Sequence, residues 1–200
     1  ELEPGCVYRA TLLLWEQIRC LMLELDDWGK RHQCDCRLQG FSTHYNFSFP
    51  NARRSRLRNA TKLAYLLAHI LQVPVMVIAT NRQSSAVGVR PRGNRIEVTA
   101  DFTPDPALML AACAFIAGAM EIVLRWEDFG LRQMKRHGIP RLTPCRLRRH
   151  SSRRGWRVTP DSLGRNPFTC DINEALWKLR DGRTLSLRAI AAETLRPFRQ

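Results

Sequence analysis

Two segments of the chain alternate polar with apolar side chains, which is the pattern of a β-strand that buries one face. Between Leu38 and Phe49, aromatic or methyl-bearing residues occupy every second position from Phe41 onward. Between Arg95 and Phe102, the apolar residues are again separated by polar ones. The polar faces carry Ser42, His44, Asn46 and Ser48 in the first segment and Glu97, Thr99 and Asp101 in the second. Because burying such groups unpaired costs several kcal/mol, each polar face must meet either water or a polar ligand.

Segments with helical spacing of apolar residues surround these two strands. The expected helices span Tyr8–Trp28, Ala52–Leu71, Ala107–Trp126 and Ser186–Arg196. Thr103–Pro106 is a helix start, because proline suits the first turn of a helix. Val73–Thr80 is rich in β-branched residues and fits either a buried strand or the end of the preceding helix. Asn81–Asn94, which contains two glycines and a proline, is expected to be a polar loop.

The length and the apolar content favour one domain spanning residues 1–200. The chain has 200 residues and is 44% hydrophobic, which is ordinary for a globular protein. Its longest apolar stretches are Leu63–Thr80 and Ala107–Leu124. We interpret each as a buried helix, or a helix followed by a strand, and not as a membrane span. Because the chain begins with Glu1 and not with Met, we expect the domain to be incomplete at its N-terminus.

The formal net charge of +14 favours anionic partners. Basic clusters lie at Arg53–Arg58, Arg146–Arg149 and Arg153–Arg157. No motif with the aromatic spacing of a nucleic-acid-binding domain accompanies them, so nucleic acid is an alternative partner that we do not favour. A basic face without a polyanionic partner is the simpler interpretation.

The seven cysteines have irregular spacings and indicate reduced thiols in a cytoplasmic protein. Cys34 and Cys36 are separated by one residue, which is too tight for the usual structural zinc site, and no second pair accompanies them. We therefore expect these two cysteines to bind no structural metal. Cys113 lies in an apolar helical segment, where a thiol behaves as a small hydrophobic group.

The polar strand faces and the loop between them provide the candidate chemistry. Carboxylates and a neutral imidazole, such as Glu97 and His44, suit Mg²⁺ and phosphate oxygens. In the loop, Arg90 and Arg92 flank a proline, and arginine binds carboxylates and phosphates through paired hydrogen bonds. Alternatively, the polar strand faces and the basic loop are exposed to solvent, and these residues then bind no ligand. The pattern by itself leaves both interpretations open.

Four segments, taken in order, carry a resemblance to one enzyme family. The segments are Phe41–Phe47, Ala79–Ser84, Arg95–Asp101 with the alanine-rich helix after it, and Leu179–Arg183 with the final helix. They resemble a strand with Ser-Thr and Asn, an Ala-Asn-Ser-Pro-like segment, a Leu-Glu-Phe-Arg-x-x-Asp strand and an Asp-x-x-Thr-Gly hairpin of the glutamate–cysteine ligases. These enzymes are carboxylate–amine ligases of the glutamine-synthetase superfamily. The resemblance extends from about Leu38 to the C-terminus.

The resemblance implies an α+β fold with a curved antiparallel sheet that holds ATP and Mg²⁺ and with helices packed on its outer face. It implies that ATP phosphorylates a carboxylate and that an amine then attacks the acyl phosphate. The expected partners are small-molecule carboxylate and amine substrates, with no membrane, and a homo-oligomer is compatible with this function. The implied catalytic residues are Glu97, Arg90 and Arg92, the cofactor-binding residues are His44, Asn46, Asn81 and Arg82, and the metal ligands are Glu97, Glu1, Glu3 and His44.

Two alternatives stay open beside the ligase. Thr99 stands where the family has an arginine, so one alternative is a relative that keeps the fold and has lost catalysis. The arginines that could replace the missing one are Arg90, Arg92 and Arg95. The other alternative is a basic nucleic-acid-binding module. Convergence of Glu97, His44 and Asn46 on one surface favours the ligase or its inactive relative, whereas a continuous arginine face with scattered carboxylates favours nucleic acid.

Overall fold

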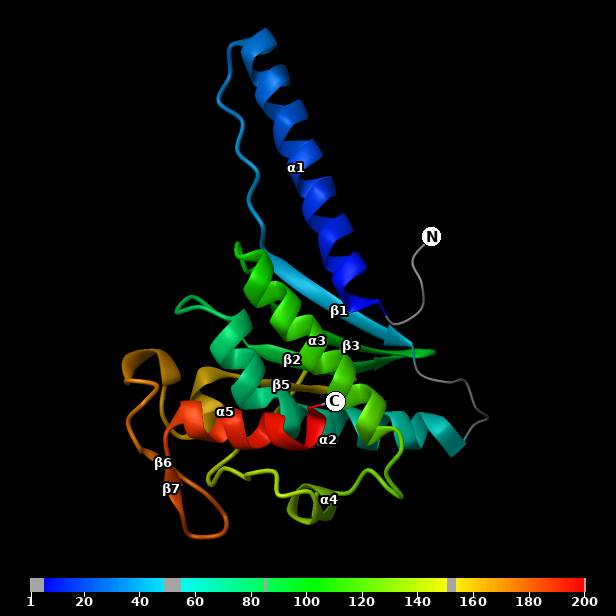
Figure 1. Cartoon of the computed structure of the whole chain (residues 1–200), viewed down its shortest axis with the longest axis vertical. Coiled ribbons are helices and arrows are strands. Elements are labelled where there is room, and N and C mark those ends of the chain that lie inside the picture. Colours follow the sequence, from blue (N-terminus) through cyan, green and yellow to red (C-terminus); the bar gives the residue numbers. More distant parts are fainter. Residues whose placement is uncertain (1–5, 49–54, 85, 151–153, 200) are drawn as a thin grey trace.

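A five-stranded antiparallel sheet lies at the centre of the molecule, with the strand order β1-β3-β2-β5-β4 (Figure 1). The computed structural model describes residues 6–48, 55–84, 86–150 and 154–199, and only the backbone of residues 55–58. The strands are β1 (Ser42–Ser48), β2 (Val87–Arg92), β3 (Arg95–Asp101), β4 (Arg148–Arg149) and β5 (Trp156–Val158). Both strands predicted from alternation are present, as β1 and β3, and they are neighbours. The mixed α and β architecture with an antiparallel sheet is therefore confirmed.

The second strand, β2, corrects the expectation of a polar loop over Asn81–Asn94. Val87, Val89 and Pro91 are buried and alternate with Gly88, Arg90 and Arg92, which is the period of a strand. A two-residue turn that contains Gly93, with a φ of +48°, joins β2 to β3. Pro91 lies beyond the part of β2 that pairs with β5, where a residue without an N–H is tolerated. Gly88, Pro91 and Gly93, which are typical of loops, led to the expectation of a loop here.

Helix α2 (Ser55–Ala79) packs against β2, β3 and β5 on the apolar face of the sheet. It continues through Pro74, so the interpretation of Val73–Thr80 as a strand is wrong and its alternative, a helix end, is confirmed. A proline inside a helix costs about 3 kcal/mol. Val75 and Met76 are at most 2% exposed, and burial of each side chain contributes about 1.5–3 kcal/mol. Burial therefore outweighs the local cost and extends the helix.

Two further helices begin where the sequence predicts helices, and a side chain caps the start of each. In α3 (Pro106–Val123), the Asp105 side chain accepts hydrogen bonds from two backbone N–H groups of the first turn. In α5 (Leu187–Leu195), the Ser186 hydroxyl accepts one from the backbone of the first turn. Both helices pack against α2, so the core lies between the sheet and this layer. The remaining elements are α4 (Arg132–Arg136), η1 (Pro160–Leu163), η2 (Pro167–Thr169), β6 (Trp177–Lys178), β7 (Thr184–Leu185) and η3 (Arg196–Phe198).

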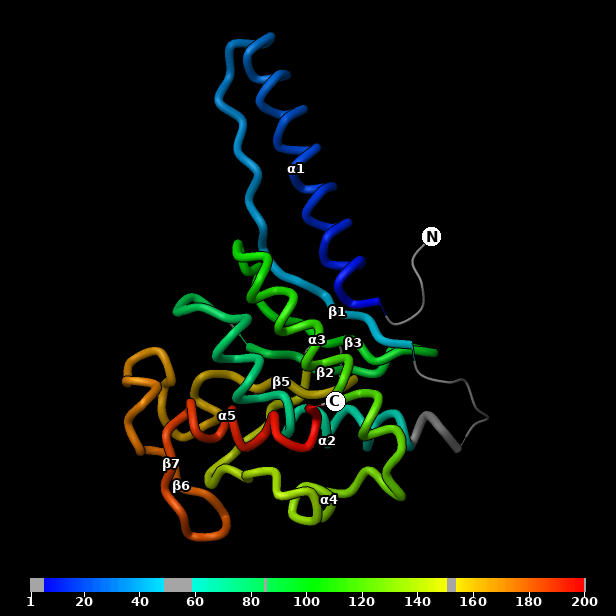
Figure 2. Tube along the Cα trace, viewed as in Figure 1, coloured from blue at the N-terminus to red at the C-terminus, as the bar shows by residue number. Residues whose placement is uncertain are grey.

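The first helix, α1 (Val7–His32), extends away from the rest of the molecule (Figure 1). Residues 33–41 return beside it toward β1 (Figure 2). Its inner end packs against α3, and of its residues only Thr11 and Gly29 are buried. Large apolar side chains stay exposed along it, namely Tyr8, Leu12, Leu13, Leu14, Leu21, Met22, Leu23 and Trp28.

Two helices are long and apolar enough to cross a membrane by length and composition alone. They are Asn59–Ala79, with 78% of the apolar window buried in the fold, and Pro106–Val123, with 39% buried. The core helix of a soluble protein has the same composition, so these two segments are weak evidence for a membrane. The absence of a membrane partner stays a prediction.

Candidate functional site

The register of the strands brings the predicted polar residues together on one face of the sheet. Asn46 of β1 and Arg90 of β2 both lie opposite Glu97 of β3. His44 lies opposite Thr99 in the same ladder. Residues paired in this way project from the same side of an antiparallel sheet. The expectation that His44, Asn46 and Glu97 share one face is therefore confirmed, and this face is opposite to the one that α2 covers.

The carboxylate of Glu97 is buried at the centre of this face and is paired with two arginines. Its Oε1 accepts a hydrogen bond from Arg90 Nε, and its Oε2 accepts one from Arg92 Nε at 3.3 Å. His44 Nδ1 lies 4.0 Å from Oε1. Burial raises the pKa of the Glu97 carboxyl, but the hydrogen bond and charge of Arg90, followed by Arg92 and His44, outweigh burial and hold this pKa below its usual value. Glu97 is therefore ionised, and it fixes the positions of both guanidinium groups.

Arg90 is held on its other side by His150, which follows β4. Arg90 Nη1 lies 3.3 Å from His150 Nε2. Burial and then the charges of Arg90, Arg157 and Arg92 lower the pKa of His150, so its ring is neutral near pH 7 and can accept a hydrogen bond from Arg90. Gly88 lies opposite Thr99, and a Cβ there would lie 2.3 Å from Thr99 Oγ1, whereas His150 Cδ2, at 3.7 Å, would be at an ordinary contact distance.

Positive charge dominates this polar face. The described strands place on it the arginines Arg90, Arg92, Arg95, Arg148 and Arg157 and the carboxylates of Glu97 and Asp101. Five arginines against two carboxylates leave three positive charges unbalanced. Arg92 and Arg95 are accessible, the Arg92 side chain being 40% exposed, and Arg95 Nε donates to Asn46 Oδ1 at 2.8 Å. The face is suited to bind phosphate or carboxylate groups.

The described residues on this face do not fit a Mg²⁺ ion. Among them, no group of three or more His, Cys, Asp or Glu side chains lies close enough to hold a metal. Both oxygens of Glu97 are occupied by guanidinium groups, whose charge opposes a second cation. Glu1 and Glu3, which the resemblance adds to the metal set, lie outside the described residues. The magnesium site stays a prediction that depends on those two residues.

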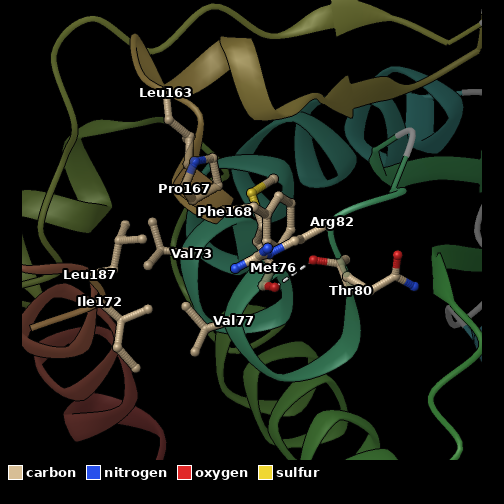
Figure 3. A pocket seen from close by; sticks show the side chains of 11 residues that line it. Val73, Met76, Val77, Thr80, Arg82, Leu163, Pro167, Phe168, Ile172 and Leu187 are labelled. Atoms are coloured by element: carbon tan, nitrogen blue, oxygen red, sulfur yellow. Dashed lines mark hydrogen bonds between the residues drawn. The ribbon is translucent and has the colours of Figure 1, made fainter. Parts of the chain in front are cut away.

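Asn81 and Arg82 lie elsewhere, at a separate pocket beyond the end of α2 (Figure 3). The backbone N–H of Asn81 donates to Asp101 Oδ2 at 3.0 Å, which fixes this segment to the end of β3. Asp101 is four residues from Glu97, or about 13 Å along an extended strand. The structure therefore does not bring Asn81 and Arg82 together with the arginine–glutamate cluster.

Two members of the site were missed in the sequence. His150 is sixty residues from Arg90, and only the β2–β5–β4 pairing brings the two together. Arg157 reaches the polar face by pairing with Gly88. In β5, buried Trp156 and Val158 lie on either side of Arg157. Three residues are too few for the alternation of a strand to be recognised in the sequence.

No protein-family model, no curated protein and no solved structure matches the chain.

Proposed function

We propose that the polar face of the sheet is the active site of an ATP-dependent carboxylate–amine ligase with a glutamine-synthetase-like fold. One observation carries the proposal: His44, Asn46 and Glu97, which the family resemblance selects, converge with Arg90 and Arg92 on one face of an antiparallel sheet. The excess of arginine there supports binding of the nucleotide phosphates and of the acid substrate.

In the proposed reaction, a carboxylate oxygen of the acid attacks the γ-phosphorus of ATP and ADP leaves. The amine nitrogen then attacks the acyl-phosphate carbon, phosphate leaves with the bonding electrons, and the nitrogen loses a proton to solvent. Negative charge builds on phosphate oxygens in both steps. Arg90, held between Glu97 and His150, needs little reorganisation to stabilise that charge. Arg92, which is more exposed, is the arginine that reaches the ligand.

Calorimetric titration with ATP, with and without MgCl₂, tests the binding part of this proposal. Arg92→Gln is expected to weaken ATP binding by about tenfold or more, because a charge-assisted contact is removed. Arg132→Gln, at an exposed arginine of α4, is the matched control and should leave binding unchanged. Failure of the unaltered protein to bind ATP with MgCl₂ at millimolar concentration would overturn the proposal.

Phosphate release in the presence of mixed amino acids and amines tests the catalytic part. Release that depends on both an acid and an amine supports the ligase. ATP binding without release supports the alternative of a relative that has lost catalysis.

A nucleic-acid-binding module is the second candidate, favoured by the five arginines that the strand register aligns on one face. Binding of a single-stranded RNA oligonucleotide would have to weaken steeply with salt, since counterions are released from the phosphates. Competition between this RNA and ATP in the titration, with no phosphate release, would favour this candidate over the ligase.

A further inference from the structure

We propose that the pocket beyond the end of α2 is a second ligand site, for a small amphipathic carboxylate whose apolar body is buried and whose charge is bound by Arg82. The cavity volume is about 340 Å³, within the range of small-molecule sites. None of the residues of the arginine–glutamate cluster, Arg90, Arg92 and Glu97, lines this pocket. The proposal is therefore independent of the ligase proposal.

Three segments that are distant in the sequence build the walls of this pocket. Met76 and Val77 come from the last turns of α2, Phe168 from η2 and Leu187 from α5 (Figure 3). Ile172, which also lines the pocket, is 36% exposed. Walls of this kind accept an apolar body, and the ring of Phe168 and the sulfur of Met76 favour an aromatic one.

Arg82 supplies the one charge among the described residues that line the pocket. Arg82 is exposed to solvent and lines the same pocket as Met76 and Phe168 (Figure 3). No ion pair joins Arg82 to a carboxylate in the part of the chain that the structure describes. A guanidinium with two parallel N–H donors fits a carboxylate, so the complementary ligand is an anion with a planar head group.

The end of α2 opposes an anion only weakly. The C-terminus of a helix carries roughly half a negative charge. The Thr80 hydroxyl donates to the carbonyl of Met76 and so satisfies one of the free carbonyl groups at this end. The full positive charge of Arg82 exceeds the helix dipole, and the net charge of +14 adds to it.

Titration calorimetry with matched ligands tests this assignment. The probes are 3-phenylpropionate, its uncharged amide 3-phenylpropanamide, and propionate, which has the carboxylate without the ring. We expect 3-phenylpropionate to bind about tenfold or more tightly than either of the other two, because it alone uses both the walls and Arg82. Arg82→Gln should remove the preference for the acid over the amide.

Two variants serve as controls and one fills the cavity. Arg165→Gln changes an exposed arginine outside the pocket, and Arg92→Gln changes the other candidate site, so both should bind 3-phenylpropionate like the unaltered protein. Val77→Phe places a ring in the cavity and should weaken 3-phenylpropionate and its amide alike. Equal affinity for the acid and the amide, or unchanged binding by both Arg82→Gln and Val77→Phe, would overturn the proposal.

Discussion

The carboxylate of Glu97 and the guanidinium of Arg90 are direct cross-strand partners in the central part of the sheet, and both are largely buried, with side chains 6% and 12% exposed. Removing one member of such a pair leaves the other charge poorly compensated. Substitution of Glu97 is therefore expected to change both the free energy of unfolding and the positions of the two arginines.

Glu97→Gln is expected to lower the free energy of unfolding by roughly 2–4 kcal/mol at pH 7, because Arg90 and Arg92 lose their common counter-charge. The folded-state pKa of Glu97 is depressed, so its contribution is complete above the ordinary pKa of glutamate, about 4.3, and is lost as the pH falls through the lower folded-state value. Urea unfolding of both proteins from pH 7 to pH 3 should show the difference shrinking with acid. Glu127→Gln, in an exposed ion pair, should change stability by less than about 0.5 kcal/mol. A stability loss for Glu97→Gln no larger than that of this control would contradict the prediction.

His69 is expected to make the protein less stable below pH 6.5. Burial, followed by the charges of Arg141 and Arg180, lowers the pKa of His69 from 6.5 to about 4. Between these two pH values the unfolded chain binds a proton at His69 and the folded chain does not. The free energy of unfolding therefore decreases by up to about 3 kcal/mol as the pH is lowered from 6.5 to 4. His69→Gln should flatten the dependence of the unfolding free energy on pH between 6.5 and 4.5. An equally steep dependence in the variant would show that other groups cause it.

Gly88→Ala is expected to lower the free energy of unfolding by about 1–3 kcal/mol, because the new methyl group overlaps the Thr99 hydroxyl. The clash has one identified partner, so the double variant Gly88→Ala, Thr99→Ala should recover much of that loss. A double-mutant cycle by chemical denaturation measures this coupling. Purely additive losses would indicate that the backbone, and not Thr99, limits the space at Gly88.

Cys34 and Cys36 are expected to bind no structural metal. Their sulfur atoms lie 3.7 Å apart near the far end of α1, and the described residues contain no cluster of three metal-ligating side chains around them. Elemental analysis of the purified protein should find zinc well below one equivalent. Stoichiometric zinc that disappears in Cys36→Ser would contradict this expectation.

Local patterns in the sequence were sufficient to predict the elements in which the periodic pattern runs uninterrupted over several residues. The alternation around His44 and Glu97 predicted β1, β3 and their shared polar face, and the Thr103–Pro106 segment predicted the start of α3. These outcomes depend on side-chain period and on hydrogen bonds within one turn, both of which a short segment contains.

Only the tertiary structure decided the features that depend on contacts between distant segments. Burial against the sheet carried α2 through Pro74, and pairing on both sides made a strand of Val87–Arg92 despite its glycine and proline. The strand order places His150 in contact with Arg90. Arg82, which follows α2, lies at a different pocket. The free energy of each arrangement comes from packing between parts of the chain that are far apart in sequence, and no local pattern records it.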